Sequence, residues 1–230
     1  MTELLSYLAF LGEAPAALGT LATAMLLVAV SDWRWSLLSL AVQYVLAGWL
    51  FTHILEPQVA VLKILVGLMI CLVLYVTARQ VGSRAPGQDS QAPASPAAEA
   101  IKPGRAARRA LASCLSFRLL IGVLAGVAIL YATGSGHLLM PELPVFINQA
   151  ALTLIVMGLL VMGLTEEPLT AGMGLLAAMT GFELLYHSLE QATTVIGFLV
   201  GIDFLIAMII AYLTIARHQA PGAAEQGRPT

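Results

Sequence analysis

The chain has 230 residues, of which 59% are hydrophobic and 10% charged, and its formal net charge at pH 7 is −2. Its mean hydropathy of +0.89 lies outside the range of soluble domains, because a soluble fold cannot bury that much apolar surface. These values indicate an integral membrane protein whose main partner is the lipid bilayer, and they do not suggest binding to nucleic acid.

We expect an all-α fold with about seven transmembrane helices, because about 20 helical residues cross a bilayer core about 30 Å thick. Apolar runs near this length predict spans at Ala14–Val30, Trp35–Leu55, Val59–Thr77, Leu111–Ala132, Val145–Leu164, Leu169–Leu189 and Thr193–Ile215. The fourth span contains Arg118 near its start, so six spans are an alternative.

A segment rich in Pro, Ala, Ser and Gly separates the third span from the fourth. It holds almost no large apolar residue and cannot offset its own ordering entropy, which predicts a disordered linker. The chain then divides into an N-terminal three-helix membrane segment (1–80), a basic linker (81–110), a four-helix membrane segment (111–218) and a disordered tail (219–230). The spans are thus arranged as three plus four.

Basic residues concentrate in two of these segments and predict the orientation. The linker and its edges carry Arg79, Arg84, Lys102, Arg105, Arg108 and Arg109, and the C-terminal end carries Arg217 and Arg228. Positive residues favour the cytoplasmic side of the inner (plasma) membrane, and four spans between linker and tail put both on one side. We therefore expect a cytoplasmic linker and C-terminus with the N-terminus outside. The predicted outer loops agree, since they contain Glu56, Glu142 and Glu190 without Lys or Arg.

Ionisable residues inside spans are the candidates for function, because each costs about 2.5–3.5 kcal/mol at a helix centre. Three stand out: Lys63 near the start of the third span, Glu183 in the sixth and Asp203 in the seventh. Gln43, His53 and His187 are weaker members of the same set. We assign Lys63, Glu183, Asp203 and His187 to a possible proton path.

The sixth span places Glu183, His187 and Glu190 on one helical face, because their spacing is four and then three residues. A buried carboxyl and an imidazole that titrates near neutrality can exchange protons along such a face. Simpler interpretations stay open. His187 and Glu190 can belong to the membrane interface, Lys63 can extend its amine to the headgroups, and Asp203 can be a neutral hydrogen-bonding residue.

No nucleophile and base pair, metal-ligand spacing or nucleotide-binding motif is present, so we expect no cofactor, no metal and no catalysis by the chain alone. Cys71 and Cys114 lie in or beside apolar segments without any metal-binding spacing, and we interpret both as small core residues.

The segments GMGLLAAMTGFELLYHSLE and GFLVGIDFLIAMIIAYLTIARH, with the span before them, resemble the K subunit of respiratory complex I and the C subunit of Mrp antiporters. The whole chain is similar to component E of hydrogenase-4 type complexes. VAVLKILVGLMICLVLYVTARQ, with Lys63, is similar to that family's third span, and GIDFLIAMII, with Asp203, to its last span. The family's sixth-span carboxylate would fall near Met179, one helical turn before Glu183.

This resemblance implies a non-catalytic membrane-arm subunit of a proton (or cation) translocating oxidoreductase. The implied partners are other membrane-arm subunits, both antiporter-like and hydrogenase-like or complex I-like. Two alternatives remain. One is a small stand-alone secondary transporter or channel, and the other is a purely structural assembly subunit.

Overall fold

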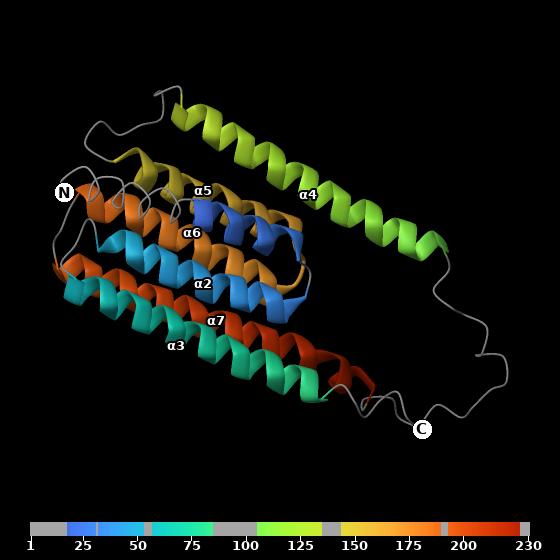
Figure 1. Cartoon of the computed structure of the whole chain (residues 1–230). Helices are drawn as coiled ribbons and strands as arrows, with labels where there is room; N and C mark the ends of the chain where they lie inside the picture. The colour runs from blue at the N-terminus through green and yellow to red at the C-terminus, as the bar shows by residue number, and fades with distance from the viewer. Residues whose placement is uncertain are drawn as a thin grey trace.

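The computed structural model describes residues 18–30, 32–52, 57–84, 105–134, 144–189 and 193–225. Regular structure in these residues is helical throughout, with no strand among them. A helix at Leu18–Ala29 comes first. Six longer helices follow: α2 (Trp33–Phe51), α3 (Pro57–Arg84), α4 (Arg105–Gly134), α5 (Val145–Leu164), α6 (Pro168–Leu189) and α7 (Thr193–Glu225) (Figure 1).

Five of the described helices are long and apolar enough to cross a membrane. These spans are Val59–Val81, Ser116–Gly134, Val145–Leu164, Pro168–His187 and Thr194–Arg217. Large apolar side chains cover the outer faces of α3, α4 and α7, where Leu65 is 60%, Leu124 68% and Phe198 69% exposed. Water-soluble proteins do not expose apolar surface on this scale, so lipid is the natural solvent of these faces. The chain is therefore a multi-pass membrane protein.

The predicted fourth span is among these five, although Arg118 lies in its first turn. Nη2 of Arg118 donates a hydrogen bond to Oγ1 of Thr165, at 2.7 Å, which gives the guanidinium a polar partner. The Leu18–Ala29 helix is shorter than a span, and α2 with its 19 residues is not one of the five. The total of seven spans in a three-plus-four arrangement therefore stays a prediction.

The helices lie side by side and run in alternating directions (Figure 1). One end of the bundle is named here the cavity end. Helices α2 and α6 terminate there, and α3, α5 and α7 begin there (Figure 1). At the opposite end, the linker end, α3 and α7 end and α4 begins (Figure 1). The linker and tail therefore leave the bundle at the same end, while the assignment of that end to the cytoplasm stays a prediction.

Helices α5 and α6 approach each other through glycine. A Cβ atom on Gly158 of α5 would lie 2.5 Å from the backbone oxygen of Gly174 and 2.6 Å from the backbone nitrogen of Ala178. The two backbones can be this close only because no side chain separates them, which is a common way of packing helices in lipid. This contact sets the position of α6, which carries two of the candidate site residues.

Helix α4 lies at the edge of the bundle (Figure 1). Its Gly122 faces Met25 and Val28 of the Leu18–Ala29 helix. Its Gly126 faces Leu21 of that same helix and Met157 of α5. Ser39 of α2 donates a hydrogen bond from Oγ to the carbonyl oxygen of Thr23 at 2.6 Å. The Leu18–Ala29 helix is therefore packed against both α2 and α4.

Three helices extend beyond the predicted boundaries of the linker and tail. Helix α3 continues to Arg84, α4 begins at Arg105, and α7 continues to Glu225. A span that is already helical can be lengthened without a new nucleation cost, and Ala and Arg, which dominate the start of α4, favour helix. The rest of the predicted linker, 85–104, lies outside the described residues, as do 226–230 of the tail.

Candidate functional site

The three ionisable residues singled out within the spans meet inside the bundle. Nζ of Lys63 on α3 forms an ion pair with Oε2 of Glu183 on α6 and donates a hydrogen bond of 2.7 Å to Oδ2 of Asp203 on α7. Their exposed fractions are 7% for Lys63, 1% for Glu183 and 0% for Asp203. These residues, named here the Lys63 cluster, come from three different helices.

Helix register brings each of these side chains to the interior. On α3, Lys63 shares a buried face with Ala60, Ile70 and Leu74. On α7, Asp203 shares one with Ala207 and Ile210. Spacings of three, four and seven residues put side chains on one side of a helix. The lysine therefore points into the protein. Of the two interpretations of its sequence position, the one in which its amine extends to the headgroups does not hold.

The Lys63 cluster has unequal numbers of positive and negative groups. One ammonium faces two carboxyl groups, so the cluster carries an excess negative charge when all three groups are ionised. Neither Oε1 of Glu183 nor Oδ1 of Asp203 has a hydrogen-bond partner among the described residues. An uncompensated charge in a low-dielectric interior is costly, so one further positive charge, such as a proton on a carboxyl, is needed for neutrality.

His187 lies one helical turn beyond Glu183 on α6 and is 3% exposed. Its Nδ1 is 2.7 Å from the backbone carbonyl oxygen of Glu183. Because a carbonyl oxygen only accepts, this hydrogen bond requires the proton on Nδ1, and in the neutral ring it leaves Nε2 as an acceptor. The ring packs edge-on against Phe51 of α2, with 5.6 Å between centroids.

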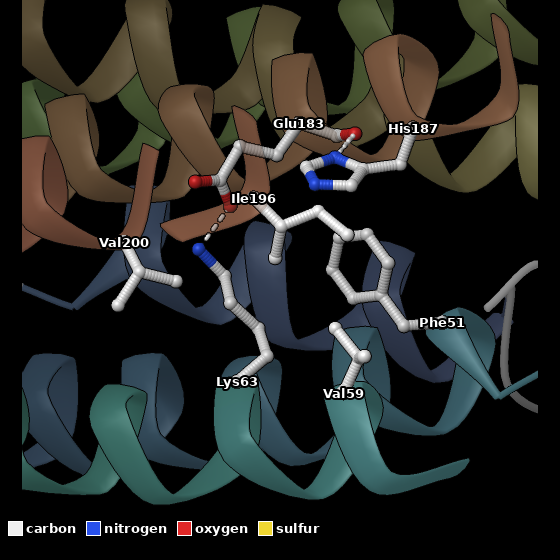
Figure 2. Close-up of a pocket in the computed structure, with 7 residues that line it drawn as sticks. All are labelled: Phe51, Val59, Lys63, Glu183, His187, Ile196 and Val200. Atoms are coloured by element: carbon white, nitrogen blue, oxygen red, sulfur yellow. Dashed lines mark hydrogen bonds and ion pairs between the residues drawn. The ribbon is translucent and has the colours of Figure 1, made fainter. Parts of the chain in front are cut away.

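A small cavity adjoins this arrangement. Figure 2 shows Lys63 pointing from α3 toward the carboxylate of Glu183, with the His187 ring between Glu183 and Phe51. The cavity, named here the His187 cavity, is lined by Phe51, Val59, Lys63, Glu183, His187, Ile196 and Val200. It leaves about 10 Å³ for the centre of a water-sized molecule, which is roughly the room that one water molecule needs.

The remaining polar residues named from the sequence are less informative. Gln43 is 1% exposed, and neither atom of its side-chain amide has a hydrogen-bond partner among the described residues. His53 and Glu190 lie outside the described residues. The predicted polar stripe on the sixth span can therefore be followed only from Glu183 to His187.

Tyr44 of α2 belongs to the surroundings of the site and was not identified from the sequence. Its side chain is 2% exposed and its hydroxyl has no partner in hydrogen-bond geometry, although it lies near Thr180 and interacts electrostatically with Asp203 and Glu183. Tyrosines in membrane proteins concentrate at the lipid headgroups. A tyrosine seven residues before the end of its helix was the available signal.

Within the described residues, no group of three or more His, Cys, Asp and Glu side chains is arranged to hold a metal ion. The Lys63 cluster has the wrong composition for such a site, because its central group is a cation. The arrangement is suited to binding and releasing a proton, or to fixing three helices relative to one another. Comparisons with protein-family models, with curated proteins and with solved structures give no match.

Proposed function

We propose that this protein is a non-catalytic membrane-arm subunit of a redox-driven, proton-translocating complex of the complex I and group 4 hydrogenase type. In this role the Lys63 cluster binds and releases one proton on a path that runs laterally between subunits. The electron chemistry belongs to partner subunits. The chain itself supplies buried ionisable groups within the membrane.

The observation that carries the proposal is the sharing of one buried ammonium by two buried carboxyl groups. Lys63 lies between Glu183 and Asp203, with both contacts inside the bundle. A purely structural ion pair reaches neutrality with one acid and one base, whereas this cluster needs an additional proton to do so. That proton can move between two carboxyl groups that contact the same ammonium, which is what a relay step requires.

The proposed type of parent complex is based on the sequence resemblance. The segments around Lys63 and Asp203 are those that resemble the third and last spans of hydrogenase-4 component E. In this protein the two residues are hydrogen-bonded to each other although 140 positions separate them in the chain. Two residues that resemblance singled out independently are thus partners in one cluster, which supports treating them as a functional unit.

The contacts also favour a second candidate, a structural assembly subunit. An ion pair that joins α3, α6 and α7 fixes three helices that are distant in sequence. A stand-alone transporter is less well supported, since broken helices at mid-membrane mark many such sites. The five spans described here are each continuous helix.

Affinity purification of the tagged chain from native membranes, followed by mass spectrometry, tests the proposal. We expect antiporter-like subunits and hydrogenase-like or complex I-like subunits in stoichiometric amounts. Recovery of the chain alone, as a homo-oligomer that exchanges ions in vesicles, would contradict the proposal and favour the transporter. A wild-type chain extracted in a detergent that dissociates membrane complexes is the matched control for non-specific recovery.

A further inference from the structure

The Lys63 cluster is not at the middle of the membrane spans. Lys63 is four residues from the first residue of its span and Glu183 four residues from the last residue of its own, which is about 6 Å of helix at 1.5 Å per residue. Asp203 is nine residues from the start of its span and fourteen from its end. All three residues therefore lie nearer to the cavity end of the bundle than to the linker end.

The space and the polar atoms next to the cluster are also on this side. The His187 cavity is lined by Phe51 and His187, which are near the ends of α2 and α6, and by Val59 and Ile196, which are near the starts of α3 and α7. Glu183 has a carboxylate oxygen without a hydrogen-bond partner. Buried polar atoms of this kind are usually satisfied by ordered water when the site has room for it. The cavity has room for about one water molecule.

The opposite side of the cluster is filled by apolar side chains. Between the cluster and the linker end, the buried residues of α2, α3, α6 and α7 include Leu37, Leu40, Ile70, Leu74, Met173, Leu176, Ala207 and Ile210, each at most 8% exposed. Close packing of such residues leaves no room for a chain of water molecules. This layer separates the cluster from the end at which the linker and tail leave the bundle.

Three of the buried hydroxyls on that side are already committed to their own helices. The hydroxyls of Thr180, Thr77 and Thr214 donate hydrogen bonds to carbonyl oxygens of their own helices, at 2.9, 2.9 and 2.8 Å. The titratable groups on this side are Tyr44, which interacts electrostatically with Glu183 and Asp203, and Cys71, which interacts with Tyr44. A phenol and an apolar-buried thiol both keep their protons at neutral pH, so neither is a titrating proton carrier in this range.

We infer that the Lys63 cluster is a one-ended site, which exchanges its proton through a single water molecule in the His187 cavity with the cavity end of the bundle and is closed toward the linker end. The inference rests on the proposed function, since it specifies where the proton enters and leaves. A proton that crosses the whole membrane then needs a second half-path in a neighbouring subunit. The chain alone conducts no protons from one face to the other.

Carbodiimide labelling in sealed vesicles tests this inference, because a carbodiimide reacts with the protonated form of a carboxyl group. Vesicles from membranes that contain the intact chain and its partners are prepared with the internal and external pH set independently. Dicyclohexylcarbodiimide, which crosses the bilayer, is added, and labelling of Glu183 is quantified by peptide mass spectrometry. Glu167, which is exposed at the linker end, is measured in the same digest as an internal reference for the other side.

We expect labelling of Glu183 to fall severalfold when the pH at the cavity end is raised by about two units, and to stay constant when only the pH at the linker end changes. Glu167 should respond to the linker end alone. If Glu183 follows the pH of the linker end, or of both ends, the one-ended site is wrong although the cluster still binds a proton. If Glu183 follows neither pH, the cluster holds no exchangeable proton, and the proposed function fails together with this inference.

Discussion

Replacement of Lys63 by Met removes the only cation among the described residues that contacts the two buried carboxyl groups. Methionine keeps an unbranched side chain of similar length, so the change removes charge without creating a large cavity. Glu183 and Asp203 then face each other across the position of the missing ammonium, at 1% and 0% exposure. Removing one partner of a buried ion pair typically costs about 3–5 kcal/mol, and we expect the folded state to lose an amount in this range.

The triple variant Lys63→Met, Glu183→Gln, Asp203→Asn separates the loss of the ion pairs from the loss of packing. Full replacement of a buried ion pair by hydrophobic side chains of similar volume is commonly neutral or stabilising by about 1–4 kcal/mol, whereas the amides of Gln and Asn remove the buried charge but still need hydrogen-bond partners. The triple variant should therefore recover part of the stability that Lys63→Met loses.

The assay is reversible unfolding in mixed micelles, with the folded fraction followed as the proportion of denaturing detergent is increased. Val45→Met is the matched control, because Val45 lies on α2 with a 44% exposed side chain and should change little. A Lys63→Met variant within about 0.5 kcal/mol of the wild type, the usual range of surface substitutions, would refute the reasoning that the ammonium compensates buried negative charge.

Three further predictions follow from the packing and the sequence. Gly158→Ala should destabilise the protein by about 1–3 kcal/mol, because the added Cβ would overpack against the backbone of α6. Gly163→Ala on the same helix is the control, since its Cβ would meet nothing within 4 Å. Thermal unfolding in detergent compares the two variants. Cysteines placed at Arg105 and in the C-terminal tail should both react with membrane-impermeant reagents from the cytoplasmic side only, and reaction from opposite faces would contradict the topology. Shortening Ala85–Ala100 should leave expression and assembly nearly unchanged, because the composition of this segment offers no apolar core. Blue-native gels measure both, and severe loss of folded protein would show that the segment is needed.

The membrane spans were largely predictable because the bilayer imposes a length and an apolar composition on each helix. The predicted spans at Val145–Leu164 and at 193–215 correspond to helices that begin at the same residues. Helix ends were less predictable. The linker and tail contain Pro and Gly, but a neighbouring span can extend into such segments, as α7 does to Glu225, because its nucleation cost has already been met.

Individual members of the site were predictable, whereas their contacts were not. An ionisable side chain within an apolar span is conspicuous, which singled out Lys63, Glu183 and Asp203. Their meeting depends on the rotation of α3, α6 and α7 about their axes and on which helices are neighbours. Both depend on tertiary packing, including the close approach of α5 and α6 at Gly158. Tyr44 was not found because a single aromatic residue in a span carries no charge to mark it.

The central claim is that the Lys63 cluster carries a proton that the parent complex moves. Its most direct test is redox-coupled proton uptake into sealed vesicles that contain the assembled complex with Glu183→Gln and Asp203→Asn together. Amides keep the size and hydrogen bonding of the two side chains but cannot bind and release a proton in this range. With blue-native gels confirming an intact complex, we expect proton uptake per electron transferred to fall well below the wild-type value while the partner oxidoreductase still turns over. Full proton uptake by the assembled double variant would contradict it and leave the structural subunit as the better explanation.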